Sequence, residues 1–170
     1  MPAPQVDTRK AARRPLKFTT TAELRAELDR LERAHRAGTL RKTGNWTPGE
    51  IFDHLGKVIE FAFDGFPPGH NPPIFVRLMG RALKGYMSSG RTLPPGFVLS
   101  PDAAYMMPTP GASFDVGLAR LRRTLDRLDS GERLEQLSPA FGVMGHDRWL
   151  RLHFGHTQHH LGYLWPDSAE

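Results

Sequence analysis

The chain has 170 residues, of which 39% are hydrophobic and 24% charged, a length and composition typical of one globular domain. No uninterrupted apolar stretch approaches the roughly 18 residues that would span a bilayer, and no apolar segment follows the basic N-terminus as in a secretory signal. A cytoplasmic location is therefore the default expectation. Because the chain has no cysteine, disulfides and thiolate ligands are excluded, and any metal would be held by histidine nitrogens and carboxylate oxygens.

The net charge of +5 raises the question of nucleic-acid binding, because clustered lysine and arginine side chains neutralise phosphates. Five of the 23 basic residues lie in the first 17 positions, and we predict that residues 1–17 are a flexible arm. Deletion of residues 1–14, which have no apolar periodicity, should leave folding unchanged. The other basic residues alternate with acidic ones, as on solvated helix faces. We therefore expect a single helical domain over residues 18–170, with neither nucleic acid nor a membrane as partner.

The first two predicted helices have strong start signals. A capping box, in which a threonine is followed three residues later by a glutamate, stands at Thr20 and again at Thr47. The first helix should end near Gly38 and the second at Gly65, since glycine commonly closes a helix. The second helix carries an apolar stripe at helical spacing: Ile51, Leu55, Val58 and Ala62.

The rest of the chain predicts two more main helices after a long, proline-rich connection over residues 65–112. This connection has a short helix expected around Ile74 to Met87. The third main helix should begin near Ser113, and the last should span His146 to Leu164. No alternating pattern is long enough to predict a sheet. The pattern indicates an all-α protein, a four-helix bundle with one long crossover between helices 2 and 3.

Four of the eight histidines lie between positions 153 and 160 of the last predicted helix. At about 100° per residue, His156 and His160 lie one above the other at the margin of the core-facing stripe, where two imidazoles can share one ion. His153 lies between this pair and the stripe. His159 points roughly 80° or more away and is the weaker candidate. Taken alone, the HxxxH pair also fits a solvated polar helix face.

A third histidine stands at the margin of another stripe. His54 lies about 60° from the apolar stripe of the second predicted helix. Three imidazoles at the edges of two neighbouring helices could meet in a groove that opens to solvent. His35 and His70 have no such partner and are most simply surface residues.

Three stretches resemble the DUF1569 family of the DinB/YfiT-like superfamily: TGNWTPGEIFDHLGKVIEFAFDGFP, the connection with its PP and LP turns, and the closing RLHFGHTQHHLGYL. The resemblance covers nearly the whole chain after about residue 15. It implies a four-helix bundle with one long crossover, a homodimer, and a divalent metal, for which we expect zinc or nickel. The implied ligands are one histidine of the second helix and the HxxxH pair of the fourth, and these roles fall on His54, His156 and His160.

The resemblance leaves the reaction open. Better-understood members of the superfamily transfer or isomerise with low-molecular-weight thiols, but this chain has no residues that match a thiol-binding set. One interpretation is a metal-dependent enzyme acting on a small molecule, either a hydrolase or a thiol-dependent transferase or isomerase. The alternative is a non-catalytic metal-binding or structural bundle, because one fold hosts both classes.

Two residues are weak catalytic candidates. Glu50 lies one turn before His54 and could act as a general base, although its capping role is the plainer interpretation. Tyr163 could donate a hydrogen bond to a substrate, although a core tyrosine is the simpler alternative. Trp149 and His153 could form pocket walls.

We also expect the connection over residues 65–112 to pack as an ordered lid near the metal end of the bundle. The apolar side chains available to be buried in this way are Phe75, Leu78, Phe97, Tyr105 and Met106.

Overall fold

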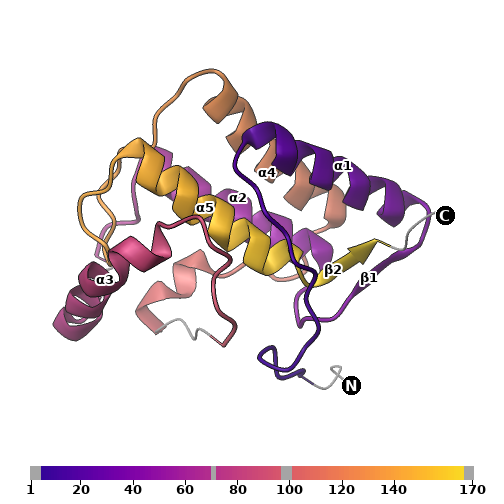
Figure 1. Cartoon of the computed structure of the whole chain (residues 1–170), viewed down its shortest axis with the longest axis horizontal. Helices are drawn as coiled ribbons and strands as arrows, with labels where there is room; N and C mark the ends of the chain where they lie inside the picture. The colour runs from indigo at the N-terminus through magenta and orange to yellow at the C-terminus, as the bar shows by residue number, and fades with distance from the viewer. Residues whose placement is uncertain (1–4, 70–71, 97–100, 167–170) are drawn as a thin grey trace.

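The computed structural model describes residues 5–69, 72–96 and 101–166, and this part of the chain is mostly helical (Figure 1). A small antiparallel sheet accompanies the helices. None of the described helices is long and apolar enough to cross a bilayer. The elements in chain order are α1 (Thr21–Arg36), β1 (Leu40–Lys42), α2 (Pro48–Asp64), α3 (Ile74–Met87), the 3-10 helix η1 (Pro101–Met106), α4 (Phe114–Asp129), α5 (His146–Leu161) and β2 (Leu164–Pro166).

The predicted helix starts are confirmed at atomic detail. The hydroxyl oxygens of Thr20 and Thr47 each accept a hydrogen bond from the backbone N–H three residues on, and the glutamate at that position accepts one in return from the threonine backbone. Ser113 caps α4 in the same way from its side chain. Gly65 ends α2 with a φ of 98°, a left-handed conformation that glycine adopts without strain.

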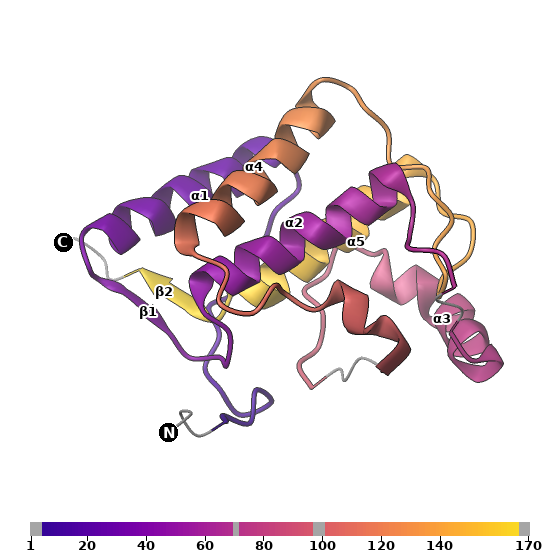
Figure 2. The same ribbon diagram turned by 180° about the vertical axis from the view of Figure 1, so that it is seen from behind.

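The core lies between four helices, with α1 beside α4 and α2 beside both α4 and α5 (Figures 1 and 2). Glycine allows α2 and α4 to approach closely, because a Cβ at Gly117 would collide with the carbonyl oxygen of Gly49. The opposite side of α2 faces α5. The largest fully buried side chains are Trp149, Phe52, Leu24, Leu28, Leu31, Ile51, Leu55, Leu121, Leu125, Leu134, Leu161 and Leu164.

Two features of the C-terminal region correct the sequence-based prediction. Helix α5 ends at Leu161 rather than Leu164, and the chain then forms β2, which pairs with β1. Leu164 lies opposite Lys42 in this pairing. Strands of three residues are too short to show an alternating pattern, so the sequence could not reveal this sheet.

The N-terminal segment lies across the end of α5. The Arg14 guanidinium donates hydrogen bonds to the Glu27 carboxylate and to the carbonyl oxygen of Leu164, and the Arg14 backbone N–H donates to Gly162 at 2.8 Å. The division into an arm over residues 1–17 and a domain over 18–170 stays a prediction. The contacts of Arg14 are nevertheless a reason to expect that removing the segment lowers stability, contrary to the sequence-based expectation.

The long connection covers the rest of the molecule only in part. Phe75 and Leu78 are not buried as expected but are 66% and 57% exposed, because α3 packs through the opposite side at Gly80 and projects from the other helices (Figures 1 and 2). Tyr105 and Met106 are half-buried and reach α2, so this later part does cover the predicted metal end. Two residues discussed above, Phe97 and His70, lie outside the described residues.

Replacing Arg14 with alanine should lower the free energy of unfolding by about 3 kcal/mol, because it leaves the Glu27 carboxylate in a buried setting without its cation. Urea unfolding followed by circular dichroism measures the change. Arg9→Ala is the matched control, because the Arg9 side chain is 72% exposed and, among the residues that the structure describes, bonds only to nearby Asp7. Equal stability of the Arg14 and Arg9 variants would show that the N-terminal contact contributes nothing.

Candidate metal centre

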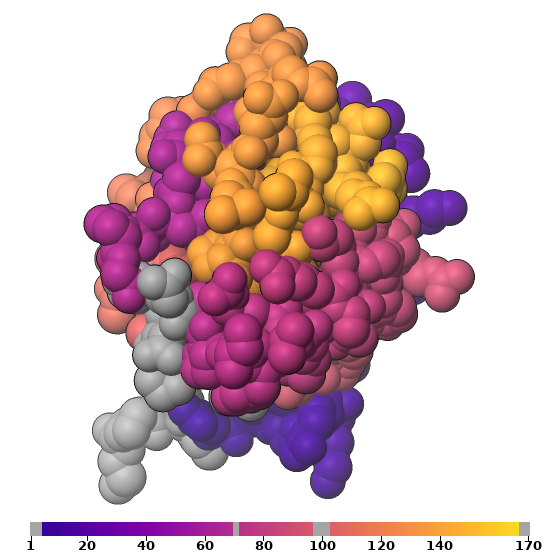
Figure 3. All heavy atoms as spheres, turned by 90° about the vertical axis from the view of Figure 1, so that its left-hand side faces the viewer, coloured from indigo at the N-terminus to yellow at the C-terminus, as the bar shows by residue number. Residues whose placement is uncertain are grey.

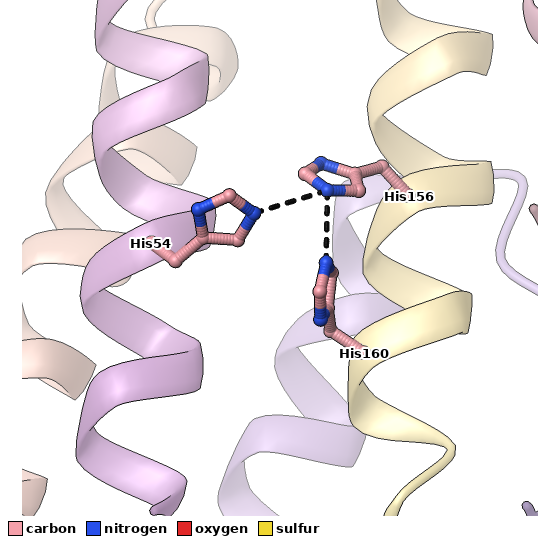
Figure 4. Close-up of side chains that lie close together, drawn as sticks. All are labelled: His54, His156 and His160. Carbon is pink, nitrogen blue, oxygen red and sulfur yellow. Dashed lines mark hydrogen bonds between the residues drawn. The ribbon is translucent and has the colours of Figure 1, made fainter. Parts of the chain in front are cut away.

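Three histidine rings converge between α2 and α5, with His54 on α2 and His156 and His160 on successive turns of α5 (Figure 4). The Nε2 atom of His156 lies 3.1 Å from Nε2 of His54 and 3.0 Å from Nε2 of His160. One nitrogen from each ring lies within 4.8 Å of the others. The structure therefore brings together the three residues on which the resemblance placed the metal.

The two short separations are of the size that metal ligands require. Nitrogens bound to a tetrahedral ion at about 2.0–2.1 Å stand about 3.3 Å from one another. Neutral imidazoles alone cannot satisfy both contacts, because Nε2 of His156 faces two nitrogens and carries either one N–H or one lone pair. The donor set and its spacing fit a single divalent ion.

A backbone carbonyl fixes the tautomer of His54. Nδ1 of His54 lies 2.6 Å from the carbonyl oxygen of Met106 in η1. Because a carbonyl oxygen only accepts, Nδ1 must carry the proton, and in a neutral ring Nε2 then keeps a free lone pair. This lone pair points toward His156 (Figure 4). The connection between α2 and α4 thus orients the His54 ring on α2.

The residues that follow Met106 tie the connection to α2. The Lys57 ammonium donates to the carbonyl oxygen of Met107 at 2.8 Å, and the backbone N–H of Thr109 donates to Oδ2 of Asp53 at 2.7 Å. Arg120 of α4 donates to the other Asp53 oxygen at 2.9 Å. Despite the burial of the carboxyl, these donors lower the pKa of Asp53 to about 2, so it stays ionised and holds the connection in place.

Burial keeps the three rings neutral. His54 is 3% exposed, and its burial lowers its pKa to about 4. The pKa values of His156 and His160 are also well below the ordinary value, first because of burial and then because the neighbouring imidazoles disfavour additional positive charge. Histidines must be neutral to bind a metal, so all three are ready to act as ligands near pH 7.

The site is partly covered, with His54 buried and His156 and His160 half-buried. The indole of Trp46 stacks on the His160 ring at 5.1 Å and contacts the His54 ring at 4.9 Å. Angular positions on single helices could not reveal this cover, because it depends on how the segment before α2 folds back over α5. The contact of the Met106 carbonyl oxygen with His54 could not be predicted either, because every residue has a backbone oxygen and the sequence does not mark this one.

The other sequence candidates lie in different surroundings. Nδ1 of His159 lies 2.9 Å from the carbonyl oxygen of Leu93 and 2.8 Å from the Arg13 guanidinium, on another side of α5. The Glu50 carboxylate accepts from the backbone of Thr47 and of Gly111. These bonds support structural roles for His159 and Glu50.

Tyr163 also has a structural partner. Its hydroxyl donates to the carbonyl oxygen of Thr8 at 2.9 Å, so it holds the N-terminal segment. The two expected pocket walls, Trp149 and His153, are both buried and stack on each other with ring centroids 5.3 Å apart.

Comparison with known proteins gives one family. The family model described as "Protein of unknown function (DUF1569)" matches residues 10–167, which include all three histidines and the segment that carries Met106. No curated protein and no solved structure matches the chain.

The metal-free protein should lose stability as pH falls below about 6.5, the pKa of histidine in an unfolded chain. Burial holds the folded-state pKa of His54 at about 4 and that of His153 at about 3, so in this window the unfolded chain binds protons that the folded chain rejects. Each such histidine removes about 1.4 kcal/mol per pH unit. Asp53, with a pKa near 2, contributes only at lower pH.

Urea unfolding between about pH 8 and pH 4.5 measures this dependence, with His54→Gln as the comparison that removes one titrating ring. A free energy of unfolding that stays constant from pH 7 to pH 5 would show that the rings are not buried as described.

Proposed function

The chain belongs to the DUF1569 family, and from the three histidines that converge within its matched region we propose that it binds a divalent metal ion through His54, His156 and His160. The single observation that carries this proposal is the meeting of three neutral imidazoles from two helices, one of them buried and two half-buried. We also infer a four-helix bundle of the DinB/YfiT-like type, supported by the packing of α1, α2, α4 and α5 and by the long connection between α2 and α4.

The ligand set favours zinc or nickel over magnesium or calcium. Imidazole nitrogen suits borderline metals, whereas magnesium and calcium prefer oxygen ligands, and the described cluster contains no carboxylate. A divalent ion held by three neutral ligands keeps its full charge and an open position, so it would supply a Lewis acid.

We propose that this site belongs to a metal-dependent enzyme that acts on a small molecule, as a hydrolase or a thiol-dependent transferase or isomerase. Three protein ligands rather than four is the number found in catalytic zinc sites. In such an enzyme, the Met106 carbonyl would hold the proton of His54 on Nδ1, and Trp46 would exclude water from one side.

The second candidate is a non-catalytic metal-binding protein. The observation that favours it is the cover over the site, since Trp46 lies against both His54 and His160. A metal in so enclosed a place could serve mainly to join α2 to α5.

We retain a homodimer in a cytoplasmic setting as a further proposal. Helix α3 exposes large apolar side chains that a second copy would cover: Ile74, Phe75, Leu78, Met79, Leu83 and Tyr86 (Figure 3). Sedimentation velocity should therefore give a dimer for the wild type and a monomer for Leu78→Glu. Val116→Glu, at a 62% exposed position on α4, is the matched control. A monomeric wild type would remove this proposal.

Single replacement of His54, His156 or His160 with alanine should abolish stoichiometric metal binding, because two imidazoles alone hold a divalent ion much more weakly than three. After stripping and reloading with zinc or nickel, elemental analysis should find about one ion per chain in the wild type. His159→Ala is the matched control and should keep its metal, because that ring faces Leu93 and Arg13. Full occupancy in His54→Ala would reduce the site to a local cluster on α5.

A further inference from the structure

His153 is a buried histidine whose ring has no polar partner. It is 4% exposed, and neither Nδ1 nor Nε2 has a hydrogen-bond partner anywhere in the described part of the chain. Its position, three residues before His156 and seven before His160, places it on the same face of α5 as these two ligands. Native proteins rarely leave buried donors and acceptors unpaired, so such a group needs an explanation.

Stacking on Trp149 fixes the orientation of the His153 ring, although neither ring nitrogen has a hydrogen-bond partner among the described residues. His153 stacks on Trp149 with the ring planes 10° apart, and the Trp149 indole N–H donates to the carbonyl oxygen of Gln136 at 3.2 Å. Burial lowers the pKa of His153 to about 3, so near pH 7 the ring is neutral and offers one N–H donor and one lone pair. This is a fixed, uncharged hydrogen-bonding group.

His153 is not positioned as a fourth metal ligand. The ring nitrogens that lie within 4.8 Å of one another belong to His54, His156 and His160, and His153 is not in this group. It is nonetheless close enough for a charge on it to lower the pKa of His156. His153 therefore stands beside the metal centre without belonging to it.

An aromatic cluster lies on the other side of His153. Trp149 stacks on Phe66 at 6.2 Å, and Tyr105 contacts the rings of Phe61 and Phe66 at 5.4 and 6.5 Å. Tyr105 directly precedes the residue whose carbonyl orients His54. The same short segment thus contributes to the aromatic cluster and to the metal centre, and His153 lies where the two meet.

We propose that His153 donates a hydrogen bond to a small organic anion that binds the metal, with the aromatic cluster packing against the apolar part of that anion. This proposal rests on the proposed metal site and names the substrate class: an organic carboxylate that bears an apolar group. The anion provides the acceptor that the His153 N–H lacks within the protein. His153 is thus a specificity-determining residue rather than a ligand of the ion.

Cobalt(II) loaded into the stripped protein provides the test, because its visible absorption reports when an anion joins the metal. Benzoate and azide are the probes, since both are anions but only benzoate carries an apolar ring. In His153→Phe the cobalt content should be unchanged, and the dissociation constants of both anions should rise about 10-fold or more, the effect of losing a hydrogen bond to a charged group. Phe66→Ala should weaken the binding of benzoate and leave the binding of azide unchanged.

His159→Phe is the matched control, because it removes an imidazole from another side of α5 and should leave both anion affinities unchanged. Unchanged affinities in His153→Phe would overturn this proposal while leaving the metal site intact, and so would a cobalt-loaded wild type that binds neither anion. A wild type that binds no cobalt would overturn the metal site itself.

Two further measurements separate this role from a purely structural one. Metal-free His153→Phe should melt at the same temperature as the wild type or higher, because the change removes unpaired polar atoms and keeps an aromatic ring against Trp149. If that variant fails to fold, NMR of the zinc-loaded wild type labelled with ¹⁵N at histidine tests the proposal instead. Benzoate should shift the His153 ring nitrogen signals, and signals that do not move would contradict the proposal.

Discussion

The packing of three imidazoles between α2 and α5, one buried and two half-buried, is the constraint on which the rest of this structure depends. A buried ring cannot keep a proton that would make it charged, so His54, His156 and His160 stay neutral near pH 7. Three neutral rings cannot satisfy one another fully, because Nε2 of His156 faces two other nitrogens and has only one N–H or one lone pair to offer. A divalent cation resolves this conflict, since it accepts all three lone pairs at once.

Several contacts determine how α2, α4, α5 and the connection lie around these three imidazoles. On one side of α2, the contact of Gly49 with Gly117 brings α4 close, and on the other side α2 faces α5. Asp53 then ties the connection to α2 through Thr109, which keeps the Met106 carbonyl against His54. Local capping, helix packing and the orientation of the His54 ring are thus all determined within a few turns of α2.

Much of the fold could be predicted from the sequence because its signals are local. Capping signals and apolar stripes predicted α1, α2 and α4, and helical angles paired His156 with His160. The short helix expected around Ile74 to Met87 is α3. What the sequence could not give depends on contacts distant along the chain: the two short strands, the cover of Trp46 over His160, and the exposed face of α3. His153 illustrates the limit, because its isolation from polar partners exists only in the folded protein.

X-ray absorption at the metal edge of zinc-loaded protein tests the central claim most directly, because it counts the ligands of the ion itself. The account predicts a first shell that contains about three imidazole nitrogens at about 2.0–2.1 Å, reduced to about two in His54→Gln. A shell with one imidazole or none, or one that His54→Gln leaves unchanged, would contradict a centre shared between α2 and α5.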